Sequence, residues 1–528
     1  MKRGYLPLET LPAWQHLNGV ELSGVAFRKF GFDEHGADKG SGIVATDTKS
    51  SSENDAKPEI LLQIPGDLVL SLETVQDYAK SDRDLRDVLE AMGDFGRTAR
   101  GAILIFLLIQ LSHNSPDLQS KHTVGVSNPW SEYVKFLPPS FPLPTFYTAQ
   151  EQELLQGTSI EGALEAKNAS LEREFDSIQE ATKSIPWCQE LWWSEGTGAL
   201  TIEDWKYIDA AYRSRMLDLP GSGLAMVPCI DMANHSCGDS VKALYEEDSQ
   251  GNAVLQLRWG KTLQPGEEIT ISYGDEKPAS EMLFSYGFLE DGRTAAREIT
   301  LNLDIPEDDP LGLPKRIFCQ NDSSIRIKAA RSSDEADEVA WESDLAWVAC
   351  VNEEDGLHFG LAQTTDGGRE LEVRWKDEKI QSPRHLREIL AADPLWEIIQ
   401  LRAAVLLLER LETQLGLLQE LQEPISKIKE DQVALESMFR PGIFETIFRF
   451  RNMEGELLEK AVEDLIKQVR EIPMPPSLTR VCLDLTDHGT RELSYWHPKS
   501  LPRILGRKQR MEMKWKTFRD VRDKTAAL

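Results

Sequence analysis

Short apolar runs alternate with polar segments near the start of the chain. The runs at residues 41–45, 60–64 and 68–71 have the length of strands and are bounded by turn-forming residues. Two polar insertions, at residues 31–42 and 46–57, lie among them. This pattern predicts a small antiparallel sheet.

Apolar residues at helical spacing replace this pattern further along the chain. Residues 85–92, 99–112 and 164–181 are predicted to form helices. Between them, residues 136–144 (FLPPSFPLP) contain prolines that exclude a regular helix or a central strand. We therefore expect a helical insertion over about residues 73–215.

Strand-like segments return after the insertion. Residues 254–259 alternate partly between apolar and polar side chains, and residues 268–272 alternate fully. Residues 281–287 then predict a short helix that ends on a glycine. The sheet is thus expected to be interrupted by the helical insertion and then resumed.

Helical character dominates the last third of the chain. Mixed strands, including residues 300–305 and 371–375, precede an almost unbroken amphipathic helical pattern at residues 385–422. Residues 433–468 continue it, and residues 503–524 are locally basic. The predicted domains are residues 1–300 with the helical insertion, residues 301–384 of mixed character, and residues 385–528 as a helical module.

The composition limits the class of protein. Its 528 residues predict two or three domains, and 41% hydrophobic residues suffice for a sizeable interior. The net charge of −29 disfavours binding of DNA or RNA and favours a basic partner. The six cysteines form no C-x-x-C pair, so neither a metal cluster nor a disulfide framework is expected.

The most apolar run, at residues 101–111, is about half as long as the ~20 residues that a membrane span needs. We interpret it as a buried helix and expect no membrane association. The first residues have no sustained apolar run before a cleavage-type site. A soluble protein of the cytoplasm or nucleus is expected, and the sequence leaves its oligomeric state open, with a monomer as the simplest expectation.

Three short segments carry candidate chemistry: residues 231–236 (DMANHS), 266–274 (GEEITISYG) and 285–288 (SYGF). Each has a structural explanation when taken alone. Asn, His and Ser can form a turn, a tyrosine at a strand end can be a core aromatic, and Tyr-Gly-Phe can end a helix. Their order along one chain is what favours a functional site.

In this order the segments resemble the carboxyl half of a SET domain. Residues 39–46 (KGSGIVAT) are similar to the Gly-x-Gly strand of the amino half. The insertion, the helical module and the local matches at residues 154–158 and 212–215 resemble the Rubisco large-subunit lysine methyltransferase group. The resemblance covers residues 1–300 well and residues 300–470 loosely. Departures are the two polar insertions and the lysine before the first glycine.

The resemblance implies an α+β fold of small β-sheets with a pseudoknot, a helical insertion and a mostly helical carboxyl-terminal domain. It also implies S-adenosyl-L-methionine as cofactor, without a metal. Tyr273 is then the catalytic tyrosine, and Tyr286 lines the same channel and shares the substrate contact with Tyr273. The implied cofactor contacts are Lys39, Gly40, Ser41, Gly42, Asn234, His235, Tyr286 and Phe288.

Two further residues keep alternative interpretations. Arg215 is either a partner for the cofactor's carboxylate or a surface arginine at a helix end. Asp231 either contacts the substrate or caps the turn before Asn234.

The expected activity is transfer of a methyl group to lysine on a non-histone protein, such as a ribosomal or translation protein. A lysine amine has a pKa near ~10.4 and must lose its proton in a desolvating channel before it can attack. The motifs also fit a histidine or an N-terminal amine as acceptor, or an inactive SET-fold module that binds a partner. Residues 385–468 are expected either to dock the protein substrate or only to stabilise the catalytic domain.

Overall fold

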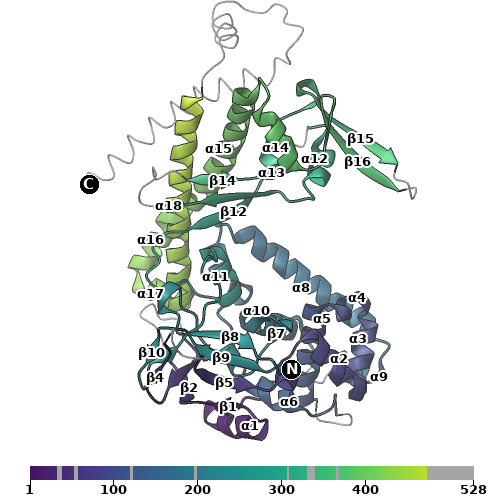
Figure 1. Ribbon diagram of the computed structural model, residues 1–528, viewed down its shortest axis with the longest axis vertical. Helices are drawn as coiled ribbons and strands as arrows, with labels where there is room; N and C mark the ends of the chain where they lie inside the picture. The colour runs from purple at the N-terminus through teal and green to yellow at the C-terminus, as the bar shows by residue number, and fades with distance from the viewer. Residues whose placement is uncertain are drawn as a thin grey trace, which may run out of the picture. The chain divides into compact units, whose positions relative to one another are not determined.

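A computed structural model describes most of the chain (Figure 1). The described residues are 1–31, 38–52, 58–118, 123–194, 199–305, 309–329, 339–363 and 368–472. The described residues form two compact units, the first within residues 1–294 and 421–453 and the second within residues 295–420 and 454–472. The predicted basic segment at residues 503–524 lies outside the described residues, as do residues 32–37 and 53–57 of the two polar insertions.

The described residues of the first unit form four small antiparallel sheets, with strand orders β1-β5-β9-β8, β11-β3-β2, β10-β4 and β6-β7. Their strands are β1 (Glu21–Leu22), β2 (Val25–Lys29), β3 (Ser41–Ala45), β4 (Lys49–Ser50), β5 (Ile60–Ile64), β6 (Met216–Leu219), β7 (Gly223–Met226), β8 (Ala243–Glu247), β9 (Ala253–Leu257), β10 (Thr262–Leu263) and β11 (Glu268–Ile269).

The predicted strands at residues 41–45 and 60–64 are confirmed as β3 and β5. The predicted strand at residues 68–71 is wrong, because a 3₁₀ turn occupies Gly66–Leu68 and Leu70 makes a single bridge to Met226. Ser71 is instead the N-cap of the next helix, where its hydroxyl accepts a hydrogen bond from the N–H of Thr74 at 3.3 Å. Capping ends the extended stretch before a ladder can form.

The helical insertion between β5 and β6 is confirmed. Its helices are α2 (Leu72–Ser81), α3 (Arg83–Ala91), α4 (Gly93–Arg97), α5 (Ala99–Asn114), α6 (Pro129–Tyr133), α7 (Ala149–Glu153), α8 (Glu161–Thr182), α9 (Pro186–Leu191) and α10 (Ile202–Arg215). The apolar helix α5 is buried on every side from Gly101 to Ser112, as expected of a core helix. Over the described residues, no helix is both long and apolar enough to cross a membrane.

Two further helices of the first unit flank its sheets in the sequence. Helix α1 (Leu11–Leu17) precedes the sheets, and α11 (Ala279–Tyr286) follows them. The predicted end of α11 at a glycine is confirmed. Gly287 has φ 83°, a left-handed conformation that often ends helices and that glycine adopts most readily.

Residues 421–453 pack on the rest of the first unit through buried polar contacts. They comprise α16 (Gln422–Glu430), α17 (Gln432–Met438) and the start of α18 (Pro441–Glu471). The guanidinium of Arg440 forms an ion pair with Glu151, whose side chain is fully buried. Arg451 donates to the backbone carbonyls of Leu154 and Gln156 at 2.8 and 2.6 Å.

The second unit is a mixture of strands and helices (Figure 1). Its sheets have the orders β12-β13-β14 and β15-β16-β17. The elements are β12 (Glu298–Asn302), α12 (Gly312–Phe318), β13 (Ser324–Lys328), β14 (Ala340–Glu342), α13 (Asp344–Ala349), β15 (Leu357–Gln363), β16 (Arg369–Trp375), β17 (Glu378–Ile380), α14 (Pro383–Ala391), α15 (Trp396–Glu420) and the remainder of α18.

The almost unbroken helical pattern predicted at residues 385–422 is confirmed with one break, because α14 ends at Ala391 and α15 begins only at Trp396. Pro394 lies between them, and proline disfavours helical backbone in the residue that precedes it. The carboxylate of that residue, Asp393, accepts a hydrogen bond from the N–H of Leu395 at 2.9 Å. A local turn therefore replaces the helix at this point.

Candidate active site

Tyr273 is fixed at both ends against residues 233–235. Its backbone N–H donates to Nδ1 of His235 at 3.0 Å, and its hydroxyl donates to the carbonyl of Ala233 at 2.8 Å. Just before it, Ile271 and His235 form a parallel bridge. Burial raises the pKa of Tyr273, and the charge of Arg215 only partly offsets this. The phenol is therefore neutral near pH 7 and acts as a hydrogen-bond donor.

His235 is held by two protein partners. Because Nδ1 accepts from Tyr273, the ring proton must lie on Nε2, which donates to Oε1 of Glu290 at 2.9 Å. The side chain of His235 is only 3% exposed. Glu290 is itself ion-paired with Arg293. Both ring nitrogens are thus occupied, which leaves the backbone of His235 for the predicted cofactor contact.

Asn234 and Gly42 lie next to each other although they are far apart in the sequence. The side-chain amide of Asn234 donates to Oε1 of Glu268 at 2.8 Å. A Cβ added at Gly42 would lie 2.5 Å from the ring of Phe30 and 2.8 Å from Nδ2 of Asn234. Glycine is therefore required at residue 42 by the protein's own packing, in addition to any ligand.

The remainder of the glycine segment lies at the start of β3. Gly40 has φ 67°, which favours glycine, and a Cβ there would meet nothing within 4 Å. Ser41 pairs with Lys29 in the β2–β3 ladder. The ammonium of Lys39 is 4.0 Å from the carboxylate of Asp291, and both side chains are exposed. Such a surface pair contributes little stability.

Four rings form an aromatic cluster with Tyr273 at its centre; they are His235, Tyr273, Tyr286 and Phe288. The centroids of Tyr273 and Tyr286 are 4.6 Å apart, and those of Tyr273 and Phe288 are 6.4 Å apart. The ring of His235 lies 5.2 Å from Tyr273 and 6.0 Å from Phe288. The structure therefore brings together the predicted residues of the third segment and those of the first two.

Arg215 and Asp231 form a buried ion pair. The guanidinium of Arg215 donates to the carboxylate and to the backbone carbonyl of Asp231, at 3.1 and 2.9 Å. The other carboxylate oxygen accepts from the hydroxyl of Tyr133 at 2.5 Å. Burial raises the pKa of the Asp231 carboxyl, and the adjacent Arg215 and Tyr133 offset part of this effect. Neither the surface position considered for Arg215 nor simple turn capping by Asp231 describes this arrangement.

The backbone beside Asp231 is strained. Cys229 has φ 70° and ψ −46°, and the N–H of Ile230 donates to the carbonyl of Pro228 at 2.9 Å. This is a γ-turn of the rare, strained kind. The N–H of Cys229 is satisfied by the hydroxyl of Tyr133 at 2.7 Å. Tyr133 thus holds both the turn and the carboxylate that follows it.

The sequence analysis did not single out three residues of the site: Tyr133, Glu268 and Glu290. Each acts through a partner at least 34 residues away, and each residue type is common on protein surfaces. Only the full alternation at residues 268–272, which places Glu268 on the same strand face as residues 270 and 272, gave a partial indication. Among the described residues, no group of three or more His, Cys, Asp or Glu side chains is placed to hold a metal ion.

Comparison with known proteins gives a family match over part of the chain, which includes Asn234, His235 and Tyr273 of this site. The SET domain family matches residues 52–274. SET domain-containing protein 8 of Schizosaccharomyces pombe is 28% identical over 345 residues, which cover 64% of this chain and 71% of that protein. The actin-histidine N-methyltransferase of Gallus gallus is 22% identical over 463 residues, covering 85% of this chain and 67% of that protein.

Solved structures share the fold. The SET domain of LSMT bound to lysine and AdoHcy superimposes with a TM-score of 0.59 at 17% identity, covering 92% of this chain and 96% of that one. Rubisco LSMT bound to AdoMet gives the same TM-score and identity. The predicted α+β SET fold and the resemblance to the Rubisco large-subunit methyltransferase group are thereby confirmed.

Proposed function

From the SET domain that this chain carries, related to those of protein methyltransferases, we propose that it transfers a methyl group from S-adenosylmethionine to a lysine of another protein. The observation that carries the proposal is the fixed position of Tyr273. Its backbone and hydroxyl are both bonded to residues 233–235, and its ring lies in the aromatic cluster. A tyrosine held in this way can orient an acceptor nitrogen without rearranging.

The residues at the site fit S-adenosylmethionine. Nε of Arg215 is buried without a hydrogen-bond partner among the described residues, and it can donate to a carboxylate. A Cβ added at Gly40 would meet no protein atom within 4 Å, so the backbone there is open to a ligand. Asn234, Ser41, Gly42 and the backbone of His235 would supply the remaining polar contacts. When bound, the cofactor supplies a methyl carbon made electrophilic by its sulfonium.

The aromatic cluster prepares the acceptor. Rings that exclude water disfavour the charged form of a lysine amine and lower its pKa, so that its lone pair becomes available. The faces of Tyr273, Tyr286 and Phe288 can also stabilise the positive charge that develops on the nitrogen. Because the hydroxyl of Tyr273 donates to Ala233, its oxygen lone pairs remain free to accept a hydrogen bond from the amine.

Histidine is the second candidate acceptor. The relative from Gallus gallus, named an actin-histidine N-methyltransferase, aligns over 85% of this chain. A neutral imidazole needs no large pKa shift near pH 7, so the same aromatic cluster would accommodate it. Acid hydrolysis of labelled protein and separation of methyl-lysine from methyl-histidine decides between the two.

The charge supports a basic protein as substrate. The net charge of −29 attracts basic surfaces and steers their approach. We propose a ribosomal or translation protein of the cytoplasm or nucleus as the substrate class, with residues 385–468 contributing to its docking.

Calorimetry of S-adenosylmethionine binding tests the proposal. We expect the native protein to bind, Asn234→Ala to lose most of the affinity, and Tyr273→Phe to retain it. Ser240→Ala, on the exposed 3₁₀ turn Gly238–Ser240, is a control that should bind like the native protein. A folded native protein without affinity would refute the methyltransferase proposal in favour of an inactive partner-binding module.

A further inference from the structure

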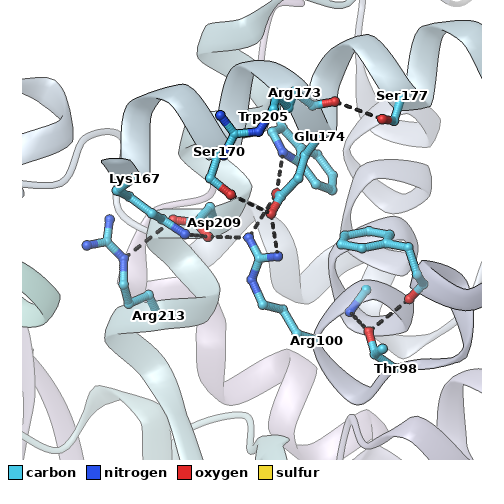
Figure 2. A network of polar contacts seen from close by, with 12 residues as sticks. Thr98, Arg100, Lys167, Ser170, Arg173, Glu174, Ser177, Trp205, Asp209 and Arg213 are labelled. Carbon is cyan, nitrogen blue, oxygen red and sulfur yellow. Dashed lines mark hydrogen bonds and ion pairs between the residues drawn. The ribbon is translucent and has the colours of Figure 1, made fainter. Parts of the chain in front are cut away.

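A partly buried ion network lies in the helical insertion (Figure 2). Its centre is Asp209 on α10, whose side chain is 1% exposed. Oδ1 of Asp209 accepts from Arg100 at 2.8 Å and from Lys167 at 2.7 Å. Its other oxygen faces Nε of Arg213 at 3.4 Å. Burial would raise the pKa of Asp209, but Lys167 and Arg213 hold it below its usual value.

A second carboxylate joins the network from α8. Glu174 accepts two hydrogen bonds from the guanidinium of Arg100, at 2.9 and 3.0 Å, and one from the indole of Trp205 at 3.1 Å. Arg100 is thereby fixed between Glu174 and Asp209 (Figure 2). Bidentate pairs of this kind restrict the orientation of both partners. The network is therefore a rigid support for the side chains at its edge.

Arg213 is the member of the network that contacts α11, the helix that ends at Tyr286. Its Nη1 donates to the carbonyl of Phe284 at 2.6 Å, and its guanidinium lies 4.8 Å from the centre of the Phe284 ring. Its Nη2 is 3.4 Å from the hydroxyl of Thr145. The network has three positive side chains, Arg100, Lys167 and Arg213, and two negative ones, Glu174 and Asp209. It therefore carries one excess positive charge, and the guanidinium of Arg213 lies against the Phe284 carbonyl.

The carbonyl of Phe284 lies in the last turn of α11, where carbonyls lack intrahelical partners. The N–H of Gly287 bonds to the carbonyls of Met282 and Leu283 and not to that of Phe284. Positive charge at a helix C-terminus is also favourable because of the helix dipole. Arg213 therefore supplies a hydrogen-bond donor to the carbonyl of Phe284, two residues before Tyr286.

We propose that Arg213, held by Asp209, is a positioning residue that caps the C-terminal end of α11 and fixes the ring of Tyr286 against Tyr273. Its catalytic consequence rests on the proposed methyl transfer. Without the cap, Tyr286 would occupy several positions relative to Tyr273, from which it is now 4.6 Å. The acceptor channel would then lose its defined shape while the cofactor residues Asn234 and Gly42 kept theirs.

Fluorine NMR of protein labelled with 3-fluorotyrosine tests the position of Tyr286 without any acceptor. The chain has ten tyrosines, and Tyr286→Phe assigns the relevant signal. In Arg213→Gln we expect this signal to shift or broaden. The exposed Arg173→Gln is the matched control, because Arg173 lies on α8 beside the network and its side chain makes no contact with Arg213 (Figure 2). Its Tyr286 signal should remain that of the native protein.

Tritium transfer from S-adenosylmethionine to the proteins of a cell extract tests the consequence. In Arg213→Gln we expect the rate at saturating cofactor to fall at least about tenfold, while the cofactor Kd stays within about twofold. Should Arg213→Gln fail to fold, Arg213→Lys is used instead, because it keeps a positive charge beside Asp209. Its single ammonium cannot contact both Asp209 and the carbonyl of Phe284, as the guanidinium does. We expect the same changes in that variant.

An unchanged Tyr286 signal in either folded variant would overturn the proposal. Equal losses of cofactor affinity and rate would also overturn it, because they indicate general damage to the site. Absence of transfer by the native protein would instead refute the proposed function, and the fluorine signal would still decide whether Arg213 positions Tyr286.

Discussion

Nδ1 of His235 accepts a hydrogen bond from the backbone N–H of Tyr273 at 3.0 Å, and the two rings lie 5.2 Å apart. This contact links the Asn-His segment to the strand end that carries the tyrosine. It also sets the histidine tautomer, so that Nε2 donates to Glu290. One side chain thus fixes the backbone of the proposed catalytic residue.

Replacing this histidine should damage the site beyond the loss of one ring. In His235→Phe the N–H of Tyr273 and the carboxylate of Glu290 both lose a partner in a buried region. Each unsatisfied group costs about 1–3 kcal/mol. We expect the free energy of unfolding to fall accordingly in urea denaturation followed by tryptophan fluorescence.

His358→Phe is the control for this experiment, because His358 is exposed on β15. It should change the free energy of unfolding by no more than about 0.5 kcal/mol. Equal stability of the two variants would contradict the assigned hydrogen bonds of His235.

The ion pair between Arg215 and Asp231 predicts a large effect of removing one charge. Asp231→Asn leaves the Arg215 guanidinium buried without its counter-charge, and breaking such a pair costs about 3–5 kcal/mol. Asp239→Asn removes a fully exposed carboxylate and should leave stability nearly unchanged. Denaturant midpoints measure the difference, and a loss below about 1 kcal/mol for Asp231→Asn would show that the pair is not buried as described.

Replacing Gly42 by alanine should lower cofactor affinity, because the added Cβ would clash with other side chains of the protein. The Cβ of Gly42→Ala would lie 2.8 Å from Nδ2 of Asn234 and should displace that amide from its position. We expect S-adenosylmethionine affinity to fall at least about tenfold, or about 1.4 kcal/mol. Gly266→Ala strains the backbone at φ 86° but meets no neighbour, so it should lower stability without changing affinity. Equal S-adenosylmethionine affinities in the two variants would show that Asn234 does not contact the cofactor.

The ion pair between Glu151 and Arg440 predicts a pH dependence. Burial would raise the pKa of Glu151, but the hydrogen bonds from Arg440 and Thr148 lower it below its usual 4.5. A carboxyl with a lowered pKa stabilises the folded state above pH 4.5, and this contribution is lost as the pH falls through its folded-state pKa. The difference in Tm between native protein and Glu151→Gln should therefore shrink below pH 4.5.

Glu153→Gln is the matched control for Glu151, because Glu153 lies on the same helix with an exposed side chain. It should show no such pH dependence. A Tm difference for Glu151→Gln that persists unchanged at low pH would contradict the assignment of this pair.

Local patterns predicted the elements whose structure is decided locally. The run at residues 41–45 became β3, and the glycine at residue 287 ended α11 as expected. The alternating segment 268–272 forms a ladder only over Glu268–Ile269, since Ile271 changes partner to His235 in a parallel bridge. The alternation of apolar and polar side chains is the same whichever strand a segment pairs with, so it cannot reveal this change of partner.

The site was predictable only as far as its motifs reach. Tyr273, Tyr286 and Phe288 were identified because they occur in order within short segments, and the structure gathers their rings. Tyr133 and Glu290 were not identified, because they act across 98 and 55 residues of sequence. Contacts at such separation are set by the fold as a whole, and single residues of common type give no local indication of them.

Methyl transfer itself tests the central claim most directly. Native protein is incubated with tritiated S-adenosylmethionine and a cell extract, beside Tyr273→Phe and the Ser240→Ala control. We predict labelled protein with the native chain and the control, methyl-lysine after acid hydrolysis, and at least about a hundredfold less label with Tyr273→Phe. Labelling by Tyr273→Phe at the native rate, or no labelling by a native protein that binds the cofactor, would contradict the account.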